Sequence, residues 1–385
     1  MKILIVHNQL WAHYKAIIFN ELQKIINQNQ HDSLLVVQIS SIEKSRVDLG
    51  SLDNSIHQYP YKLLHEGTLE EVSLAKRVSG ILKAIKNVKP DIVNLTGYYD
   101  LASWIVLGYC KMKGIKTILS NESTANDHVR NGFKESVKAF IIKQFDGYFN
   151  FGTASENYLL SLGISKEKML VKRNCVDNKV LKEIYLKQIP FRNVQQKRLN
   201  LAPKNFIFVG RLIEYKNLVR FLEAFGLAQK KSVHNWGVII LGDGELKTDL
   251  QEAVSNKNIQ NISFQKGVSW QQVPEYLALS DVLVLPSYSE PWGLVVNEAM
   301  ACGLPVLASD KCGCAIDLVR NGKNGFTFSP ENIEELTDLL IKFMNTDEDN
   351  LRKMGEISEQ IIQDYSPENV GREMYEGFKS LFGNK

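Results

Sequence analysis

Short runs of Val, Ile and Leu recur along this chain of 385 residues, separated by longer segments in which apolar residues repeat with a helical period. The runs are continuous rather than alternating, which is typical of strands that are covered on both faces. Strands are predicted at residues 2–7, 34–39, 91–95, 117–120, 147–151, 169–172, 205–209, 237–241, 262–264, 282–285, 305–308 and 325–328. Helices between consecutive strands predict parallel βαβ units, and therefore an α/β protein with two doubly wound domains.

A polar, lysine-rich stretch from Asp177 to Lys204 separates the two sets of strands. We therefore predict an N-terminal Rossmann-like domain over residues 1–180, a linker over 181–204, a second Rossmann-like domain over 205–365 and a C-terminal helix over 366–385. Ligands of open parallel sheets bind beyond the carboxyl ends of the strands. Two such domains that face each other across a cleft would line it with strand-to-helix loops, which is where chemistry is expected.

Composition is that of an ordinary globular protein, with 44% hydrophobic and 23% charged residues. The apolar run at the N-terminus is too short for a signal peptide, and no later run spans a bilayer, so a cytoplasmic location is expected. The five cysteines are scattered without the spacing of a zinc site, and we interpret them as reduced, mostly buried thiols.

The first candidate motif is a strand that runs into Gly210, followed by Arg211 and, five residues later, Lys216. Arginine offers a rigid fork of donors to phosphate oxygens and lysine a mobile point charge. Together they can neutralise a diphosphate without a metal. The simpler interpretation is a surface ion-pair cluster with Glu214.

The second motif follows the strand at 282–285 and is more specific. A helix is predicted from Pro291 to Gly303, with Gly293 keeping side-chain bulk away from its N-terminus, where free backbone N–H groups favour an anion. Glu290 precedes the helix and Glu298 lies two turns into it. Carboxylates accept hydrogen bonds from paired sugar hydroxyls, so the pair suits a nucleotide sugar. Alternatively, both are ordinary charges at a helix start and on a helix surface.

These motifs, Gly210-Arg211-Leu212 with Lys216 and Glu290-Pro291-Trp292-Gly293-Leu294 ending in Glu298-Ala299-Met300-Ala301-Cys302-Gly303, resemble the signature of family 4 retaining glycosyltransferases, of the glycosyltransferase group 1 type. Asn174-Cys175-Val176-Asp177 is similar to that family's Asn-Gly-Val-Asp, with Cys in place of Gly, and Gly242-Asp243-Gly244 is similar as well. The resemblance extends from about residue 170 to the end of the chain.

The resemblance implies a GT-B fold with the donor on the C-terminal domain, the acceptor on the N-terminal one, and a last helix that crosses back to the first domain. It implies that Arg211 and Lys216 bind the donor diphosphate, that Glu290 holds the transferred sugar, and that Glu298 takes the ribose hydroxyls. Arg211, Lys216 and Glu290 are the catalytic candidates. The remaining donor-binding positions that it implies are Gly210, Val268, Gly293, Leu294 and Val295.

The function expected from this resemblance is retaining, metal-independent transfer of a hexose from a UDP- or GDP-sugar to a hydroxyl of a glycan or lipid-linked acceptor, in bacterial cell-surface polysaccharide or glycolipid synthesis. No cofactor and no metal are expected, and Asp347-Glu348-Asp349 is interpreted as a solvated loop. A nucleotide-sugar epimerase on the same fold is the alternative enzyme. A nicotinamide-dependent dehydrogenase is disfavoured because no Gly-x-Gly-x-x-Gly follows a strand, and a non-catalytic sugar-binding subunit because the charged positions are intact.

The N-terminal half departs from the family pattern. The loop after the first strand, from His7 to Lys15, lacks the glycines of many members, and Glu122 follows the strand at 117–120 where members often place a histidine. Acceptor-side candidates are therefore His13, Lys15, Glu122 and His128. For both histidines a surface or packing role is an equal alternative.

Charge is distributed unevenly, because residues 1–200 carry 28 Lys and Arg against 18 Asp and Glu, whereas residues 201–385 carry 18 against 25. A basic half suits an anionic membrane surface or a phosphorylated acceptor, and plain solubility is the simpler explanation. The segment 133–145 is a basic amphipathic helix that we interpret as half-buried. Expected partners are the nucleotide-sugar donor, a glycan or lipid-linked acceptor and the inner face of a membrane, and not nucleic acid.

Overall fold

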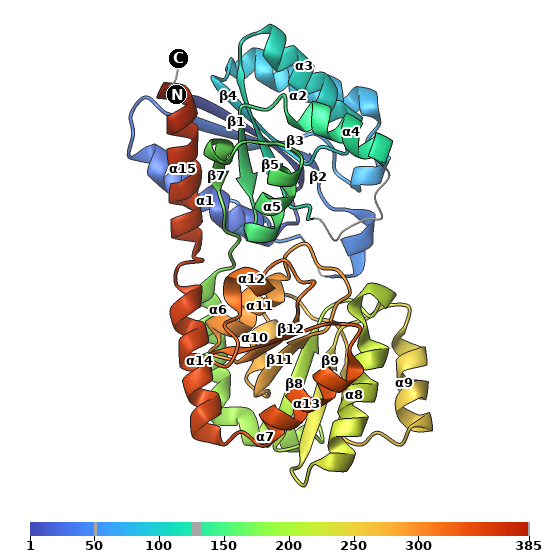
Figure 1. The fold of residues 1–385 in the computed structure, drawn as a ribbon. Coiled ribbons are helices and arrows are strands. Elements are labelled where there is room, and N and C mark those ends of the chain that lie inside the picture. The colour runs from blue at the N-terminus through green and yellow to red at the C-terminus, as the bar shows by residue number, and fades with distance from the viewer. Residues whose placement is uncertain (50–51, 125–131, 384–385) are drawn as a thin grey trace. The chain divides into compact units, whose positions relative to one another are not determined.

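The computed structural model describes residues 1–49, 52–124 and 132–383 (Figure 1). The chain forms two compact units: unit 1 comprises Met1–Val176 with Ser366–Lys385, and unit 2 comprises Asp177–Tyr365. In these ranges no helix is both long enough and apolar enough to cross a membrane.

Unit 1 is built on a parallel sheet in the order β3-β2-β1-β4-β5-β6-β7. The strands are β1 (Lys2–Gln9), β2 (Ser33–Ser40), β3 (Tyr61–Leu63), β4 (Ile92–Thr96), β5 (Lys116–Asn121), β6 (Gly147–Asn150) and β7 (Met169–Val171). Its helices are α1 (His13–Asn27), α2 (Leu74–Val88), α3 (Leu101–Met112), α4 (Gly132–Ile142), α5 (Thr153–Ser161) and α15 (Pro367–Gly383), with short 3-10 turns η1 (Lys44–Leu49), η2 (Asn54–Ile56), η3 (Leu69–Glu71) and η4 (Lys166–Lys168).

Both faces of the unit 1 sheet are covered, as continuous apolar strands predict. Alternate residues of β1 point to opposite faces: Leu4 and Val6 join a core with α2 and α3, while Ile3 and Ile5 join another with α1 and α15. The final helix, α15, packs along α1 (Figure 1), and the Tyr375 hydroxyl donates a hydrogen bond to Asp32 (2.7 Å). The last helix is therefore part of unit 1.

Unit 2 repeats the architecture with a parallel sheet in the order β10-β9-β8-β11-β12-β13. Its strands are β8 (Lys204–Val209), β9 (Trp236–Leu241), β10 (Ile262–Gln265), β11 (Val282–Leu285), β12 (Val306–Ser309) and β13 (Gly325–Phe328). Its helices are α6 (Asn178–Gln188), α7 (Arg192–Arg198), α8 (Leu218–Lys231), α9 (Lys247–Asn256), α10 (Val273–Leu277), α11 (Leu294–Ala301), α12 (Ala315–Leu318), α13 (Ile333–Met344) and α14 (Glu348–Ile362), with turns η5 (Ile189–Phe191) and η6 (Glu214–Lys216). The predicted class, two doubly wound α/β domains, is confirmed.

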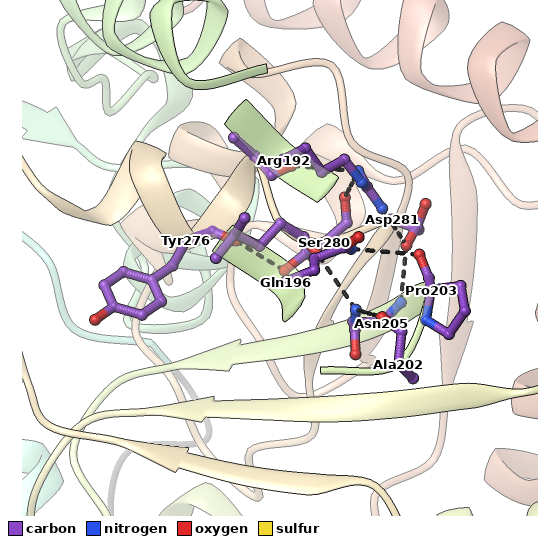
Figure 2. A network of polar contacts seen from close by, with 10 residues as sticks. Arg192, Gln196, Ala202, Pro203, Asn205, Tyr276, Ser280 and Asp281 are labelled. Atoms are coloured by element: carbon purple, nitrogen blue, oxygen red, sulfur yellow. Dashed lines mark hydrogen bonds and ion pairs between the residues drawn. The ribbon is translucent and has the colours of Figure 1, made fainter. Parts of the chain in front are cut away.

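Residues 181–204 differ from the predicted linker, because most of them are helical and fixed to unit 2 through α6, η5 and α7. Figure 2 shows the polar network that fixes them. Arg192 pairs with Asp281 (2.8 Å), which also accepts the backbone N–H of Asn205 (2.8 Å). The buried amide of Gln196 donates to the carbonyl of Leu279 (3.1 Å). Arg192 and Gln196, two of the polar residues that suggested a solvated linker, thus form internal hydrogen bonds.

Candidate functional site

The loops after β8 and β9 touch at the carboxyl edge of the unit 2 sheet. The backbone N–H of Gly210 donates to the carbonyl of Leu241 (3.0 Å), and that of Gly242 donates to Gln265 (3.1 Å). A Cβ atom on Gly242 would lie 1.9 Å from the carbonyl oxygen of Gly210, so a side chain is excluded there. Glycine at Gly242 therefore permits a close approach of two loops, which brings the Gly210–Lys216 segment into a fixed position.

Asp243 fixes the third loop of this edge. Its carboxylate accepts the backbone N–H of Gly267 (2.7 Å) and a hydrogen bond from Lys247 (2.8 Å). The Lys247 hydrogen bond is the largest of the causes that lower the pKa of Asp243, so its charge persists at neutral pH. Val268, a predicted donor-binding residue, directly follows this anchored glycine and is half-buried.

Lys216 lies in the turn η6 and forms an ion pair with Glu290, which follows β11. Both side chains are mostly buried, with 16% and 19% of their surfaces exposed. A Cβ atom on Gly210 would lie 4.0 Å from Cε of Lys216, so the lysine stem runs past the glycine turn. The structure thus brings Gly210, Lys216 and Glu290 together, and the ion pair with Glu214 considered above is not formed.

Asn217, which the sequence reasoning missed, holds the η6 turn in place. It adopts a left-handed conformation (φ 56°), and its buried side-chain amide donates to the carbonyls of Pro286 (3.1 Å) and Pro330 (2.9 Å). Asparagine is one of the few residues that tolerates this conformation. An Asn directly after the candidate lysine was the available signal.

The helix of the second motif begins at Leu294, later than the predicted Pro291, because Gly293 takes a left-handed conformation (φ 98°). A Cβ atom there would lie 2.8 Å from Cδ2 of Leu285 and 3.3 Å from Cγ of Glu290. Glycine therefore lets the Glu290 loop fold onto the start of α11. The N–H groups at Leu294 and Val295 lie in the first turn, where helix geometry provides no intrahelical acceptor.

The loop after β12 packs against the turn from Glu290 to Gly293. The backbone N–H of Gly313 donates to the carbonyl of Glu290 (2.8 Å), and that of Cys314 donates to Trp292 (3.0 Å). All five cysteines are buried and free, as predicted. Burial raises the pKa of Cys312 and Cys314, so both thiols are neutral and serve packing.

Glu298 is a half-buried carboxyl on the second turn of α11. Its side chain forms no hydrogen bond or ion pair with any residue that the structure describes, and burial raises its pKa to about 8. A desolvated carboxyl without a partner is typical of a site that waits for a ligand's donors. Arg211, by contrast, is exposed, and none of the described residues forms an ion pair with it.

In unit 1 the structure pairs two of the acceptor-side candidates. Nζ of Lys15, on α1, lies 2.7 Å from Oε1 of Glu122 and 3.4 Å from the centroid of the Phe151 ring. The lysine side chain is 6% exposed and the glutamate 43% exposed. Desolvation works to raise the pKa of Glu122, but the charge and hydrogen bond of Lys15 outweigh it and lower the pKa. Glu122 is therefore an ionised carboxylate with an open side.

His7, which was not among the candidates, lies near this pair at the carboxyl end of β1. Its Nδ1 is 3.0 Å from Oε1 of Gln38, and burial, aided by the charge of Lys15, lowers its pKa to about 4. A polar residue at the end of an otherwise apolar strand was the signal. The ring is neutral at physiological pH.

The His13 ring makes edge contacts with the rings of Trp11 and Tyr14, whose centroids are 5.8 and 5.6 Å away. Burial, with the charge of Arg46, lowers its pKa to about 4. This favours a packing role. His128 lies outside the described residues.

Within the described ranges, no three His, Cys, Asp or Glu residues are grouped so as to hold a metal ion. In the segment Asp347-Glu348-Asp349, Asp347 accepts the backbone N–H of Asn350 (2.8 Å) and caps α14. That segment is the beginning of a helix rather than a free loop.

Residues 191–360 match the family of glycosyl transferases group 1. The match lies within unit 2 and covers less than half of the chain. The chain is 27% identical to an uncharacterised glycosyltransferase of Methanocaldococcus jannaschii, over 82% of this chain and 83% of the relative. It is 31% identical to an uncharacterised glycosyltransferase of Haemophilus influenzae over 46% of this chain, and the match spans about half the length of that relative. It is 26% identical to the UDP-Gal:alpha-D-GlcNAc-diphosphoundecaprenol alpha-1,3-galactosyltransferase of Escherichia coli, over 76% of each chain.

Solved structures share the fold of the chain over almost its whole length. Anabaena Alr3699/HepE in complex with UDP and glucose superposes with a TM-score of 0.74 at 18% identity, covering 99% of this chain and 100% of that one. The lipopolysaccharide outer core galactosyltransferase WaaB in its apo form gives a TM-score of 0.70 at 19% identity, with the same coverage. These likenesses confirm the GT-B fold.

Proposed function

We propose that the chain is a group 1 glycosyltransferase and performs retaining, metal-independent transfer of a hexose from a UDP- or GDP-sugar to a hydroxyl of a glycan or lipid-linked acceptor. The observation that carries the proposal is the mostly buried Lys216–Glu290 pair, which lies beside the Gly210 turn and next to the start of α11. The cation and the N-terminus of α11 suit the diphosphate, and the carboxylate suits the hydroxyls of the sugar.

The leaving group of the reaction is a nucleoside diphosphate, on which negative charge develops as the glycosidic bond breaks. Lys216 and Arg211 supply positive charge, and the N–H groups at Leu294 and Val295 add the dipole of α11. Glu290 holds the Lys216 ammonium in place. We infer that it accepts hydrogen bonds from the hydroxyls of the transferred sugar. Asn217 and Asp243 position these loops without contacting the donor.

For the nucleoside part we assign the ribose hydroxyls to Glu298 and the base to the segment at Val268. Glu298 is the available carboxyl on α11. Two vicinal hydroxyls can replace the water that burial removed from it. The UDP bound by Anabaena HepE and the UDP-Gal in the name of the Escherichia coli relative support a uridine donor.

The acceptor is assigned to unit 1, where Glu122 is ionised and partly open beside Lys15. A carboxylate accepts a hydrogen bond from the acceptor hydroxyl and orients it for attack. The named substrate of the Escherichia coli relative is a GlcNAc diphosphate linked to undecaprenol. This name supports a lipid-linked acceptor for the chain. It also supports a role in bacterial polysaccharide or glycolipid synthesis, performed at a membrane surface.

Product analysis by NMR tests the proposal. The full-length chain is incubated with UDP-glucose, UDP-galactose or GDP-mannose in EDTA, alone and with polyprenyl-diphosphate-linked GlcNAc. The expected result is a disaccharide that keeps the anomeric configuration of the donor and forms only when the acceptor is present. A second nucleotide sugar formed from donor alone would make the protein an epimerase, and a product of opposite configuration would refute retention.

A further inference from the structure

The helical segment that enters unit 2 carries an exposed apolar face. The backbone stays helical through α6, η5 and α7, since Gln188 and Phe191 at the junctions are in the right-handed helical region. Leu186, Phe191 and Val194 are 53%, 56% and 66% exposed, and helical spacing places them on one side of the segment.

The second half of this segment has the reverse of the usual polarity, whereas α6 buries the apolar Leu181 in the usual way. Its inward side carries Arg192 and Gln196, whose hydrogen bonds to Asp281, Pro203 and backbone carbonyls are drawn in Figure 2. A helix on a globular protein ordinarily buries its apolar side chains and exposes its polar ones. Here the internal contacts are polar, so they do not explain the three apolar residues on the outside.

Cations accompany the apolar residues on that outer side. Lys187, Lys197 and Arg198 are exposed, and they form no ion pair or hydrogen bond with the described part of the chain. We call these three cations, together with Leu186, Phe191 and Val194, the α6–α7 face. The other two cations for which the structure gives contacts, Lys182 and Arg192, pair with Glu359 and Asp281.

The excess of positive over negative charge in unit 2 lies in this segment. Residues 177–200 carry six Lys and Arg against two acidic residues, whereas residues 201–365, the remainder of unit 2, carry 15 against 22. A basic, apolar face on an acidic body suits an anionic partner. It disfavours a symmetric contact with a second copy, because a two-fold interface would set these cations against one another.

We propose that the α6–α7 face docks on an anionic lipid surface. Phe191, Val194 and Leu186 enter the boundary between headgroups and acyl chains, while the three cations meet lipid phosphates. This inference does not depend on the proposed reaction. It places the membrane contact on unit 2 rather than on the basic N-terminal half, where the charge count alone had placed it.

Flotation of the full-length chain with lipid vesicles tests the docking. One set of vesicles is pure phosphatidylcholine and the other contains equal parts of phosphatidylcholine and phosphatidylglycerol. Binding is expected only to the second set and should weaken with salt. The triple variant Lys187→Gln, Lys197→Gln and Arg198→Gln should bind on the order of 100-fold more weakly at low salt, since each cation near such a surface contributes about fivefold.

The variant Phe191→Ser with Val194→Ser should lower binding at least about tenfold through lost apolar burial. The matched controls Val233→Ser, at an apolar position 95% exposed on the same unit, and Lys230→Gln should bind like the wild type. Thermal unfolding checks that all variants fold.

Three results would overturn the proposal. In the first, the wild type fails to bind anionic vesicles. In the second, Phe140→Ser, at an apolar position 69% exposed on α4 of unit 1, abolishes binding while Phe191→Ser with Val194→Ser does not. In the third, light scattering shows a dimer that the Phe191→Ser and Val194→Ser changes dissociate, which would assign the face to a second copy.

Discussion

Binding of the proposed donor should remove a proton from Glu298. In the free protein this carboxyl has no partner among the described residues, and burial raises its pKa from 4.5 to about 8. Two ribose hydroxyls donate stronger hydrogen bonds to the ionised carboxylate than to the neutral acid, so binding lowers the pKa. The perturbation is Glu298→Gln, which keeps the shape and removes the titration.

The magnitude follows from proton linkage. With a free-state pKa of about 8, Glu298 is about 90% protonated at pH 7.0 and about 25% protonated at pH 8.5. If the carboxyl is ionised in the complex, about 0.9 proton is released on binding at pH 7.0, and the dissociation constant falls about eightfold between pH 7.0 and pH 8.5. The Gln variant should bind more weakly, without either effect.

Isothermal titration with the nucleotide sugar that binds provides the assay. Measurements at pH 7.0 in two buffers of different ionisation enthalpy give the number of protons released, and a titration at pH 8.5 gives the change in affinity. The same proton release and pH dependence in wild type and Glu298→Gln, or their absence in both, would refute the assignment of the ribose to Glu298.

The unliganded protein offers an independent check of that pKa. A carboxyl whose folded-state pKa lies above its ordinary value contributes stability at low pH and loses it as pH rises through the folded-state value. The melting temperature of Glu298→Gln relative to wild type should therefore increase between pH 5 and pH 8. A constant difference over that range would contradict the raised pKa.

Three further changes test the scaffold and the chemistry. Lys216→Ala and Glu290→Ala should each abolish transfer in the product assay while unfolding remains cooperative, with a loss of about 3 kcal/mol because each change leaves a mostly buried charge without its partner, and near-normal activity in both would disprove the site. Asn217→Gly keeps the left-handed backbone accessible but loses two buried hydrogen bonds, so urea unfolding should show a loss of about 2 kcal/mol, and Asn217→Ala should lose more because of its Cβ; equal losses would show that backbone conformation is unimportant there. Arg192→Ala leaves the carboxylate of Asp281 buried without its cation, and a loss of about 3 kcal/mol is expected, shrinking as pH falls and the acid is protonated; a pH-independent loss would point to packing instead.

The strands were predictable because a continuous run of Val, Ile and Leu is typical of a strand that is covered on both faces. All of the predicted strands are present, and only β3 was missed in the described chain. Its three residues, Tyr61–Leu63, lie at the sheet edge, one exposed and two half-buried, and include a lysine, so they lack the continuous hydrophobicity that marks a covered strand. The linker prediction was wrong for a related reason: composition reports the polar character of Arg192 and Gln196, not whether they face solvent.

Part of the site was also predictable, because residue type limits backbone conformation and charge. Gly293 and Gly242 are required by close approaches that only glycine allows, and they mark the loops correctly. The partner of Lys216 was not predictable, since Glu290 lies 74 positions away in the sequence and is brought near only by the order of β8 and β11 in the sheet. The partnership of Lys15 with Glu122 depends on tertiary packing in the same way.

The central claim is that the loops of unit 2 bind a nucleotide sugar without a metal. Thermal unfolding of the full-length chain with UDP-, GDP- and ADP-sugars in EDTA tests it most directly. One donor class should raise the melting temperature, since a ligand at 100 times its dissociation constant stabilises the native state by about 2.7 kcal/mol, and Lys216→Ala should remove that increase. Absence of stabilisation by every nucleotide sugar, or an increase that appears only when a divalent metal replaces EDTA, would contradict the account.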